Sequence, residues 1–345
     1  MIIKDFVLFN PKGKKPTDYV NYIDTSSVED GKLIDIQRLS DNIPSRAQRV
    51  IEEGDILISS VRPILKHNYY VSQNIENGIA STGFIQIRAD RSKVIPQYLY
   101  YFLTEENKVK MYQTIAETSQ STFPSFNKEV IENMAFPNVS LAGQQHIVDI
   151  LGSLDKRIEN IQKKIEKILQ LYALKYKLLI AGKSANAQLS EIAQVEAGKR
   201  PPVKESMQTA DIAIPIIGAA SIMGYTNVIL YNEPILVIGR VGTHGIVQPI
   251  FNDCWASDNT LVIKSKYYSF VYNVLNNIDY ASINKGSTQP LITQTDIRNT
   301  QIYLPAEDEL REYENCCSME VISTYRTQIE KLEIIKQLYL KKFFG

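Results

Sequence analysis

Two stretches of the sequence carry the repeat of apolar positions that is typical of long helices. In the first, apolar residues recur at alternating steps of four and three, the heptad pattern of a helix that buries a narrow seam against a partner helix. Its seam positions are Ile147, Leu151, Leu154, Ile158, Ile161, Ile165 and Ile168. Gly182 follows as a stop signal. The pattern predicts a coiled-coil helix over residues 141–183.

The second apolar repeat lies in residues 306–345 and is less regular. Its seam includes Tyr325, Ile329 and Leu332. The first helix leads from one globular region to the next, whereas the second helix follows the second region and has a seam to bury. Pairing the two helices side by side in opposite directions buries both seams. We therefore expect an antiparallel coiled coil.

Two regions of similar size, residues 1–140 and 184–305, read as short strands and loops, because β-branched and aromatic runs alternate with Gly, Pro, Asn and Asp. They resemble each other. Residues 54–62 correspond to 233–241, 80–87 to 256–263, and 119–137 to 286–305. The sequence thus predicts an α+β protein, a tandem duplication of one mixed α/β domain plus one long helix.

Charge and composition narrow the classes of function. Lys plus Arg equals Asp plus Glu, 38 of each, so the chain as a whole lacks the basic excess of many nucleic-acid-binding proteins. Only the helix over 141–183 is basic, with about twice as many basic as acidic residues. No apolar run approaches the length of a membrane span, and the first twenty residues do not resemble a signal peptide. We expect a cytoplasmic protein that does not contact a membrane.

No catalytic constellation emerges from the residues. Gly182-Lys183-Ser184 lacks the earlier glycine of a phosphate loop and ends a helix instead of starting one. Asn10-Pro11 is not followed by the residues that would hold a flipped base. The three histidines and three cysteines show no metal-ligand spacing. We expect neither an enzyme site nor a metal site in this chain.

Polar loops recur at corresponding places in the two domains. Basic and amide side chains on such loops suit phosphate contacts and the reading of base edges. Any one loop of this kind is more often an ordinary solvated turn, and the recurrence favours DNA binding. The candidate residues are Lys12, Lys14, Lys15, Arg62, Lys66, Ser119 and Gln120 in the first domain and Lys199, Arg200, Arg240, His244, Lys285 and Gln289 in the second.

The junctions between domain and helix carry a family resemblance. Gly286-Ser287-Thr288-Gln289-Pro290, and the helix start Gln144-Gln145-His146-Ile147-Val148-Asp149-Ile150-Leu151-Gly152-Ser153-Leu154-Asp155, resemble the specificity subunit of type I restriction-modification enzymes. The arrangement covers the whole chain. At the second junction Glu309-Leu310-Arg311 replaces the Gln-rich start, which weakens the match there.

This resemblance implies two target recognition domains, residues 1–140 and 184–305, joined by spacer helices over 141–183 and 306–345. Each domain would read one half of a bipartite, asymmetric site in double-stranded DNA. The chain itself would hold no cofactor and catalyse nothing. Its partners would be two methylation subunits, which use S-adenosylmethionine, and restriction subunits, which use ATP and Mg²⁺.

Two other readings stay open at this point. The chain could be a coiled-coil scaffold that binds proteins without sequence-specific DNA binding, and its neutral charge favours this alternative. It could also be a lone DNA-binding decoy or a subunit of a type II-like enzyme. The sequence contains no paired carboxylate and lysine cluster of the kind that nucleases use.

Overall fold

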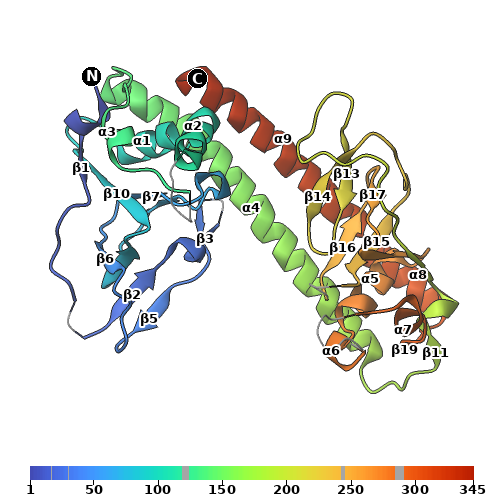
Figure 1. The fold of residues 1–345 in the computed structure, drawn as a ribbon. Helices are drawn as coiled ribbons and strands as arrows, with labels where there is room; N and C mark the ends of the chain where they lie inside the picture. Colours follow the sequence, from blue (N-terminus) through green and yellow to red (C-terminus); the bar gives the residue numbers. More distant parts are fainter. Residues whose placement is uncertain (17, 30, 119–123, 242–244, 284–290) are drawn as a thin grey trace. The chain divides into compact units, whose positions relative to one another are not determined.

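The computed structural model describes residues 1–345 except 17, 30, 119–123, 242–244 and 284–290 (Figure 1). The chain divides into two units. Unit 1 comprises residues 1–158 and 331–345, and unit 2 comprises residues 159–330. Within the described residues, no helix combines the length and the apolar character that crossing a membrane requires. The domain boundaries expected at 140, 183 and 305 stay predictions.

Unit 1 contains two four-stranded sheets. The first has the order β1 (Val7–Phe9), β10 (Phe84–Ala89), β7 (Ile56–Ser59) and β8 (Tyr69–Tyr70). The second has the order β5 (Gln37–Leu39), β2 (Val20–Ile23), β9 (Gly78–Ser81) and β6 (Ala47–Val50). A short hairpin joins β3 (Val28–Glu29) to β4 (Lys32–Leu33).

Four helices of unit 1 contribute to the core on one face of its first sheet: η1 (Ile3–Asp5), α1 (Pro96–Leu103), α2 (Glu106–Glu117) and α3 (Glu129–Glu132). Two further short helices are η2 (Thr25–Ser27) and η3 (Pro63–Leu65). Side chains alternate along β7, so Ile56 and Ile58 pack toward the helices while Leu57 packs toward the second sheet. Tyr98, Tyr101 and Tyr112 are buried in the helix-side core.

Unit 2 is built from a four-stranded and a three-stranded sheet. The first has the order β12 (Gln194–Ala197), β18 (Thr260–Lys264), β15 (Ile235–Gly239) and β16 (Val247–Ile250). The second has the order β14 (Ile222–Thr226), β13 (Ile214–Ile217) and β17 (Trp255–Ala256). A two-stranded sheet, β11 (Ala187–Gln188) and β19 (Gln301–Ile302), and the helices η4 (Leu189–Glu191), α5 (Tyr268–Asn276), α6 (Tyr280–Ile283) and α7 (Gln294–Arg298) complete it.

The two units repeat one topology, which confirms the predicted duplication. In the first sheet, β1, β10, β7 and β8 correspond to β12, β18, β15 and β16, all antiparallel. In the second sheet, β2 pairs with β5 antiparallel and with β9 parallel, and β13 pairs with β14 and β17 in the same two senses. A parallel pair at the same place in both units is the most specific sign of common architecture.

The structure corrects the predicted alignment of the copies by one residue at β7 and β15. Ile56 and Ile58 on β7 face the helix-side core of unit 1. On β15, the residues that face the corresponding core of unit 2 are Leu236 and Ile238. Because side chains alternate between the faces of a strand, a shift of one residue exchanges the faces. Val61 therefore corresponds to Val241. Each forms an isolated bridge, Val61 with Ser125 and Val241 with Leu291. The predicted match of residues 54–62 to 233–241 was wrong by this one position.

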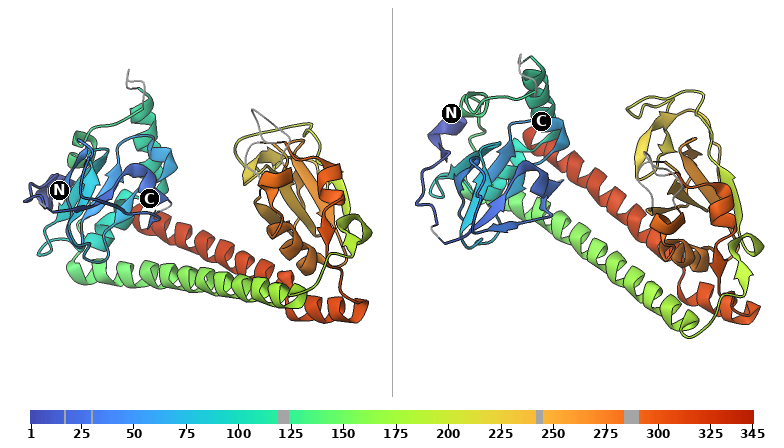
Figure 2. Two further views of the ribbon diagram at one scale, coloured as in Figure 1. Left: turned by 90° about the horizontal axis from the view of Figure 1, so that it is seen from below. Right: turned by 60° about the horizontal axis from the view of Figure 1, so that its bottom comes forward.

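Helices α4 (Leu141–Ile180) and α9 (Met319–Phe344) form the antiparallel pair (Figure 2). Within unit 2, Ile161, Ile165 and Ile168 of α4 pack against α9 residues that include Tyr325 and Ile329. Within unit 1, the predicted seam residues Ile147 and Leu151 lie in the domain core, together with Leu340 and Phe344 of α9. Ile158 is buried, whereas Leu154 and Leu332 are half-buried.

The predicted single helix over 306–345 is two helices, α8 (Glu307–Cys316) and α9, separated at Cys317 and Ser318 (Figure 2). The break follows from two different burial demands. Leu310, Tyr313 and Cys317 pack into the core of unit 2, whereas Met319 and Ile322 pack against α4. One straight helix does not present both sets in these two directions. Cys317 therefore belongs to the domain core, and its neighbour Cys316 is exposed.

The motif at the start of α4 has a structural role. The buried Gln144 side chain accepts a hydrogen bond from the backbone N–H of Ile95 at 2.8 Å and donates one to the carbonyl of Val139 at 2.8 Å. Asp155 accepts a hydrogen bond from the Tyr101 hydroxyl at 2.6 Å and pairs with Lys336 of α9 at 2.5 Å. These two motif residues fix α4 to the domain and to α9 within unit 1.

Candidate nucleic-acid interface

In unit 1 the sheet topology brings two of the predicted basic loops to one edge. Strands β1 and β7 both run antiparallel to β10. Both strands therefore run toward the end of the sheet where β10 begins: β7 ends opposite Phe84, the first residue of β10, and β1 ends opposite Ile87. The segments that leave both strands start in this direction. The first segment carries Lys12, Lys14 and Lys15, and the second carries Arg62 and Lys66. All five of these side chains are exposed.

The lysine segment is anchored at both of its ends. Asn10, with a φ of 48°, donates its backbone N–H to the Gln86 carbonyl at 2.8 Å and turns the chain away from the sheet. Further along, Lys15 Nζ donates to the Ala47 carbonyl at 3.2 Å. Between them, Gly13 lies so close to Val50 that a Cβ would come within 2.7 Å of the Val50 Cβ. Lys12 and Lys14 thus project from a segment held against β6.

Arg62 and Lys66 flank the short helix η3 and hold an unusual backbone conformation. Both are left-handed, with φ values of 47° and 53°. For a residue with a side chain this conformation costs about 1–2 kcal/mol. The hydrogen bond from Lys110 and, more weakly, the charge of Lys66 hold the pKa of Glu106 on α2 below its usual value. The loop is thus strained and lies beside α2.

Unit 2 repeats the arrangement at the ends of β12 and β15. Both strands run antiparallel to β18 and end where it begins. Gly198 passes so close to β17 that a Cβ would lie 2.1 Å from the Ser257 carbonyl oxygen, so only glycine fits. Lys199 then donates its N–H to the Ala256 carbonyl at 2.9 Å and accepts from the Trp255 indole at 2.6 Å. The Lys199 and Arg200 side chains are exposed on this fixed backbone.

Arg240 leaves β15 at the same edge. Its N–H donates to the Asn259 carbonyl at 3.0 Å, and its carbonyl accepts from the N–H of Ile292 at 2.9 Å. The side chain is half-buried. With the corrected register, Arg240 corresponds to Ser60 and not to Arg62, so the two arginines are not equivalent positions. The structure places both at corresponding sheet edges but two residues apart along the chain.

Five of the predicted site residues lie outside the described residues. They are Ser119, Gln120, His244, Lys285 and Gln289. The described chain next to two of these segments reaches the same edges: Pro124 accepts a hydrogen bond from the Arg62 N–H at 3.0 Å, and Leu291 forms a bridge with Val241. The role of the third loop in each domain stays a prediction.

Two arginines near this edge of unit 1 were not predicted from the sequence. The Arg46 carbonyl accepts a hydrogen bond from Thr82 just before β10, and the Arg46 side chain is exposed. Arg49 on β6 is half-buried, and its Nε is a buried donor without a partner among the described residues. Burial lowers the pKa of the Arg49 guanidinium. The sequence gives no signal for either residue, because only the pairing of β6 with β9 brings them here.

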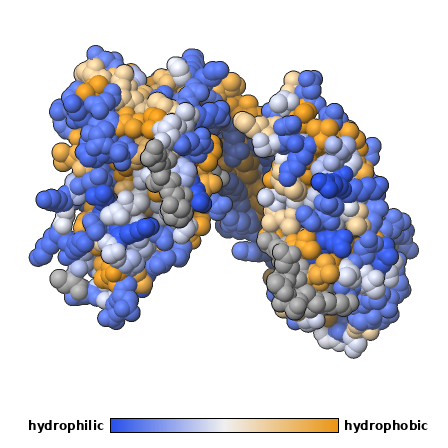
Figure 3. Space-filling model, in the orientation of Figure 1, coloured by the Kyte–Doolittle hydropathy of each residue, from blue (hydrophilic) through white to orange (hydrophobic). Residues whose placement is uncertain are grey.

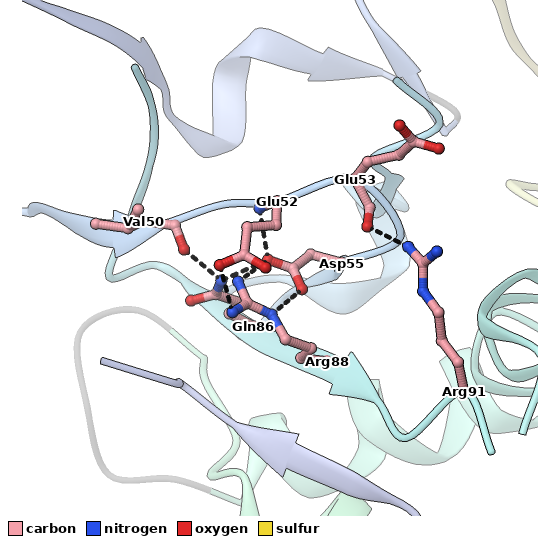
Figure 4. A network of polar contacts seen from close by, with 7 residues as sticks. All are labelled: Val50, Glu52, Glu53, Asp55, Gln86, Arg88 and Arg91. Atoms are coloured by element: carbon pink, nitrogen blue, oxygen red, sulfur yellow. Dashed lines mark hydrogen bonds and ion pairs between the residues drawn. The ribbon is translucent and has the colours of Figure 1, made fainter. Parts of the chain in front are cut away.

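A buried polar network supports the base of the lysine segment (Figure 4). Gln86 on β10 bonds to Asn10 through its backbone and donates its side-chain Nε2 to the Val50 carbonyl and to Asp55, each at 2.8 Å. Asp55 also accepts two hydrogen bonds from Arg88, both at 2.8 Å. The network joins β6, β7 and β10, so it fixes the frame from which the loops emerge.

The face of the molecule drawn in Figure 3 is mostly hydrophilic, with smaller apolar patches on each unit. The edges with basic loops can position phosphates through Lys and Arg side chains, while amide and hydroxyl side chains read base edges. The same arrangement recurs in two domains that differ in their loop residues. Such a pair of surfaces suits two different short DNA sequences.

Comparison with known proteins bears on this arrangement. Relatives include the specificity subunit of the type I restriction enzyme HindI of Haemophilus influenzae, 30% identical over 156 residues, which are 44% of this chain and 34% of that subunit. The match therefore spans about a third of that relative. The specificity subunit of the enzyme MjaIX of Methanocaldococcus jannaschii is 24% identical over an alignment of 392 positions, covering 96% of this chain and 85% of the relative.

A likeness in fold accompanies these sequence matches. The crystal structure of the S subunit of a type I restriction-modification system from M. genitalium aligns with a TM-score of 0.58 at 14% identity, covering 100% of this chain and 95% of that one. The model of the family described as type I restriction modification DNA specificity domain matches residues 2–170 and again residues 183–340. Since these two matches span nearly the whole sequence, the chain belongs to the type I restriction modification DNA specificity domain family, with two copies of the domain in tandem.

Proposed function

We propose that this chain is the DNA sequence-specificity subunit of a type I restriction-modification complex. Each globular domain, 1–140 and 184–305, reads one half of a bipartite, asymmetric site in double-stranded DNA. The observation that carries the proposal is the recurrence of exposed basic loops at the same edge of equivalent sheets in both units. The half-sites differ because the two copies share their strands but few loop residues.

The division of labour in the complex is part of the same proposal. This chain supplies recognition and no catalysis. Two methylation subunits bring S-adenosylmethionine, and restriction subunits bring ATP and Mg²⁺. The neutral charge of the chain is compatible with this role, since partner subunits can supply many of the phosphate contacts that dominate salt-dependent affinity.

A selection from random duplex DNA tests the proposal. The purified full chain, alone and with a co-expressed methylation subunit, is incubated with duplexes that carry a random central segment, and the bound DNA is sequenced. We expect enrichment of two short, different sequences separated by an unread gap. If no sequence is enriched under either condition, the proposal fails and the scaffold alternative is favoured.

Variants of unit 2 test whether the basic loop contacts DNA. Replacing both Lys199 and Arg200 with Ala should weaken binding, because their backbone is fixed and their side chains face solvent. Affinity falls with increasing salt, and each lost phosphate contact makes the slope of log affinity against log salt less negative by about 0.9. The matched control is Lys167→Ala, an exposed lysine on α4 in the same unit. Equal effects of the loop variant and the control would place the interface elsewhere.

A further inference from the structure

The loop between β7 and β8 in unit 1 presents two apolar side chains to solvent. Ile64 and Leu65 are 49% and 48% exposed, and they lie between the exposed cations Arg62 and Lys66. Scattered exposed apolar residues are common on protein surfaces. This pair differs from them in the way the loop holds it.

The loop backbone is held in one conformation. Pro63 is buried and anchors η3, whose ends are the left-handed residues Arg62 and Lys66. The N–H of Lys66 donates to the Pro63 carbonyl at 2.9 Å. From outside the loop, the Gln113 side chain on α2 accepts a hydrogen bond from the Ile64 N–H at 3.1 Å. Strained backbone of this kind persists where the surrounding structure fixes it, and it gathers at functional sites.

The neighbours of the pair indicate what it meets. Arg62 and Lys66 carry positive charge on both sides of it, and the lysine segment 12–15 emerges at the same sheet edge. A polyanion that binds these cations brings its surface against Ile64 and Leu65. In duplex DNA the apolar group on the floor of the major groove is the 5-methyl group of thymine. Contact with that methyl group removes apolar surface of both partners from water.

We propose that Ile64 and Leu65 read a thymine methyl group in the half-site that unit 1 recognises. The inference rests on the proposed function, because it assumes that this edge of unit 1 faces DNA. It assigns a specificity-determining role to two apolar residues. The flanking cations hold the phosphates and position the loop.

Replacing single thymines with deoxyuridine, which lacks only the methyl group, tests the contact. The probe is a duplex that carries the sequence enriched by the full chain, with each thymine of each half-site replaced in turn. For the unchanged protein we expect one or two positions in a single half-site to lose about four-fold in affinity, the equivalent of about 0.8 kcal/mol for one methyl group. The variant Ile64→Ala/Leu65→Ala should bind the thymine duplex more weakly and respond no further to deoxyuridine at those positions.

The control variant is Leu8→Ala, which removes an exposed apolar side chain from β1 in the same unit. It should keep the full response to deoxyuridine. The inference is overturned if the loop variant keeps that response, or if no thymine in an enriched sequence is sensitive to loss of its methyl group. Failure of the proposed function is a different result, because the unchanged chain would then enrich no sequence at all.

Discussion

Replacing Asp55 with Ala should destabilise unit 1 strongly, because the Asp55 carboxylate is the centre of its buried polar network (Figure 4). The carboxylate is 1% exposed and accepts hydrogen bonds from Gln86 Nε2 at 2.8 Å, from Arg88 Nε and Nη2 at 2.8 Å each, and from the Glu52 N–H at 2.9 Å. The variant leaves these donors facing a cavity.

The size of the effect follows from which donors keep a partner. Breaking a buried ion pair by removing one member costs about 3–5 kcal/mol. Gln86 keeps its bond to the Val50 carbonyl, and Arg88, whose side chain is 25% exposed, keeps its pair with Glu52 at 2.7 Å. We therefore expect a loss near the lower limit, about 3 kcal/mol in the free energy of unfolding of unit 1.

The single tryptophan of the chain makes it possible to assign the effect to one unit. Trp255 is buried in unit 2, so its fluorescence reports the unfolding of that unit in urea. Hydrogen exchange of the backbone amides of β7 and β10 reports the stability of unit 1. We expect Asp55→Ala to accelerate exchange in these strands and to leave the Trp255 transition in place.

Glu52→Ala is the matched control. It removes the other carboxylate that pairs with Arg88, but Glu52 is 65% exposed, and exposed ion pairs contribute about 0–1 kcal/mol. Its effect on exchange should be several-fold smaller than that of Asp55→Ala. Equal effects of the two variants would refute the reasoning, because burial and the number of hydrogen bonds would then not determine the loss.

Two further predictions concern unit 2 and use the same fluorescence signal. Ile322→Ala should lower the free energy of unfolding of unit 2 by about 2–4 kcal/mol, since Ile322 is fully buried against α4. The control Val321→Ala, at the exposed neighbouring position, should change this free energy little. Equal losses in the two variants would contradict the packing of α9 on α4. Burial raises the pKa of Glu314, although its carboxylate accepts hydrogen bonds from the N–H groups of Ser269 and Phe270. The folded state therefore keeps a proton on Glu314 at pH values where the unfolded state has lost it. As a result, the stability of unit 2 falls as the pH rises through that range. Glu314→Gln should remove this part of the pH dependence. The prediction is disproved if urea titrations at several pH values show that the unfolding free energy of the variant changes with pH as steeply as that of the unchanged protein.

The sequence by itself determined the large elements of this protein. The heptad repeat through Ile161, Ile165 and Ile168 specifies the helix α4, because an amphipathic period is a local property that survives without knowledge of the partner. The duplication is equally visible, since strands that pack in the same way need the same alternation of apolar residues. The basic loops could be named as candidates, although their meeting at one edge could not.

The tertiary structure decided the features that depend on residues far apart in the chain. The loops at Lys12 and Arg62 share an edge because β1 and β7 both pair with β10, and pairing of this kind leaves no local trace in the sequence. The exact register between the copies also needed the two cores, since a shift of one residue exchanges the faces of a strand. The break between α8 and α9 arises because Tyr313 and Ile322 pack into different cores, a conflict that an apolar repeat alone does not reveal.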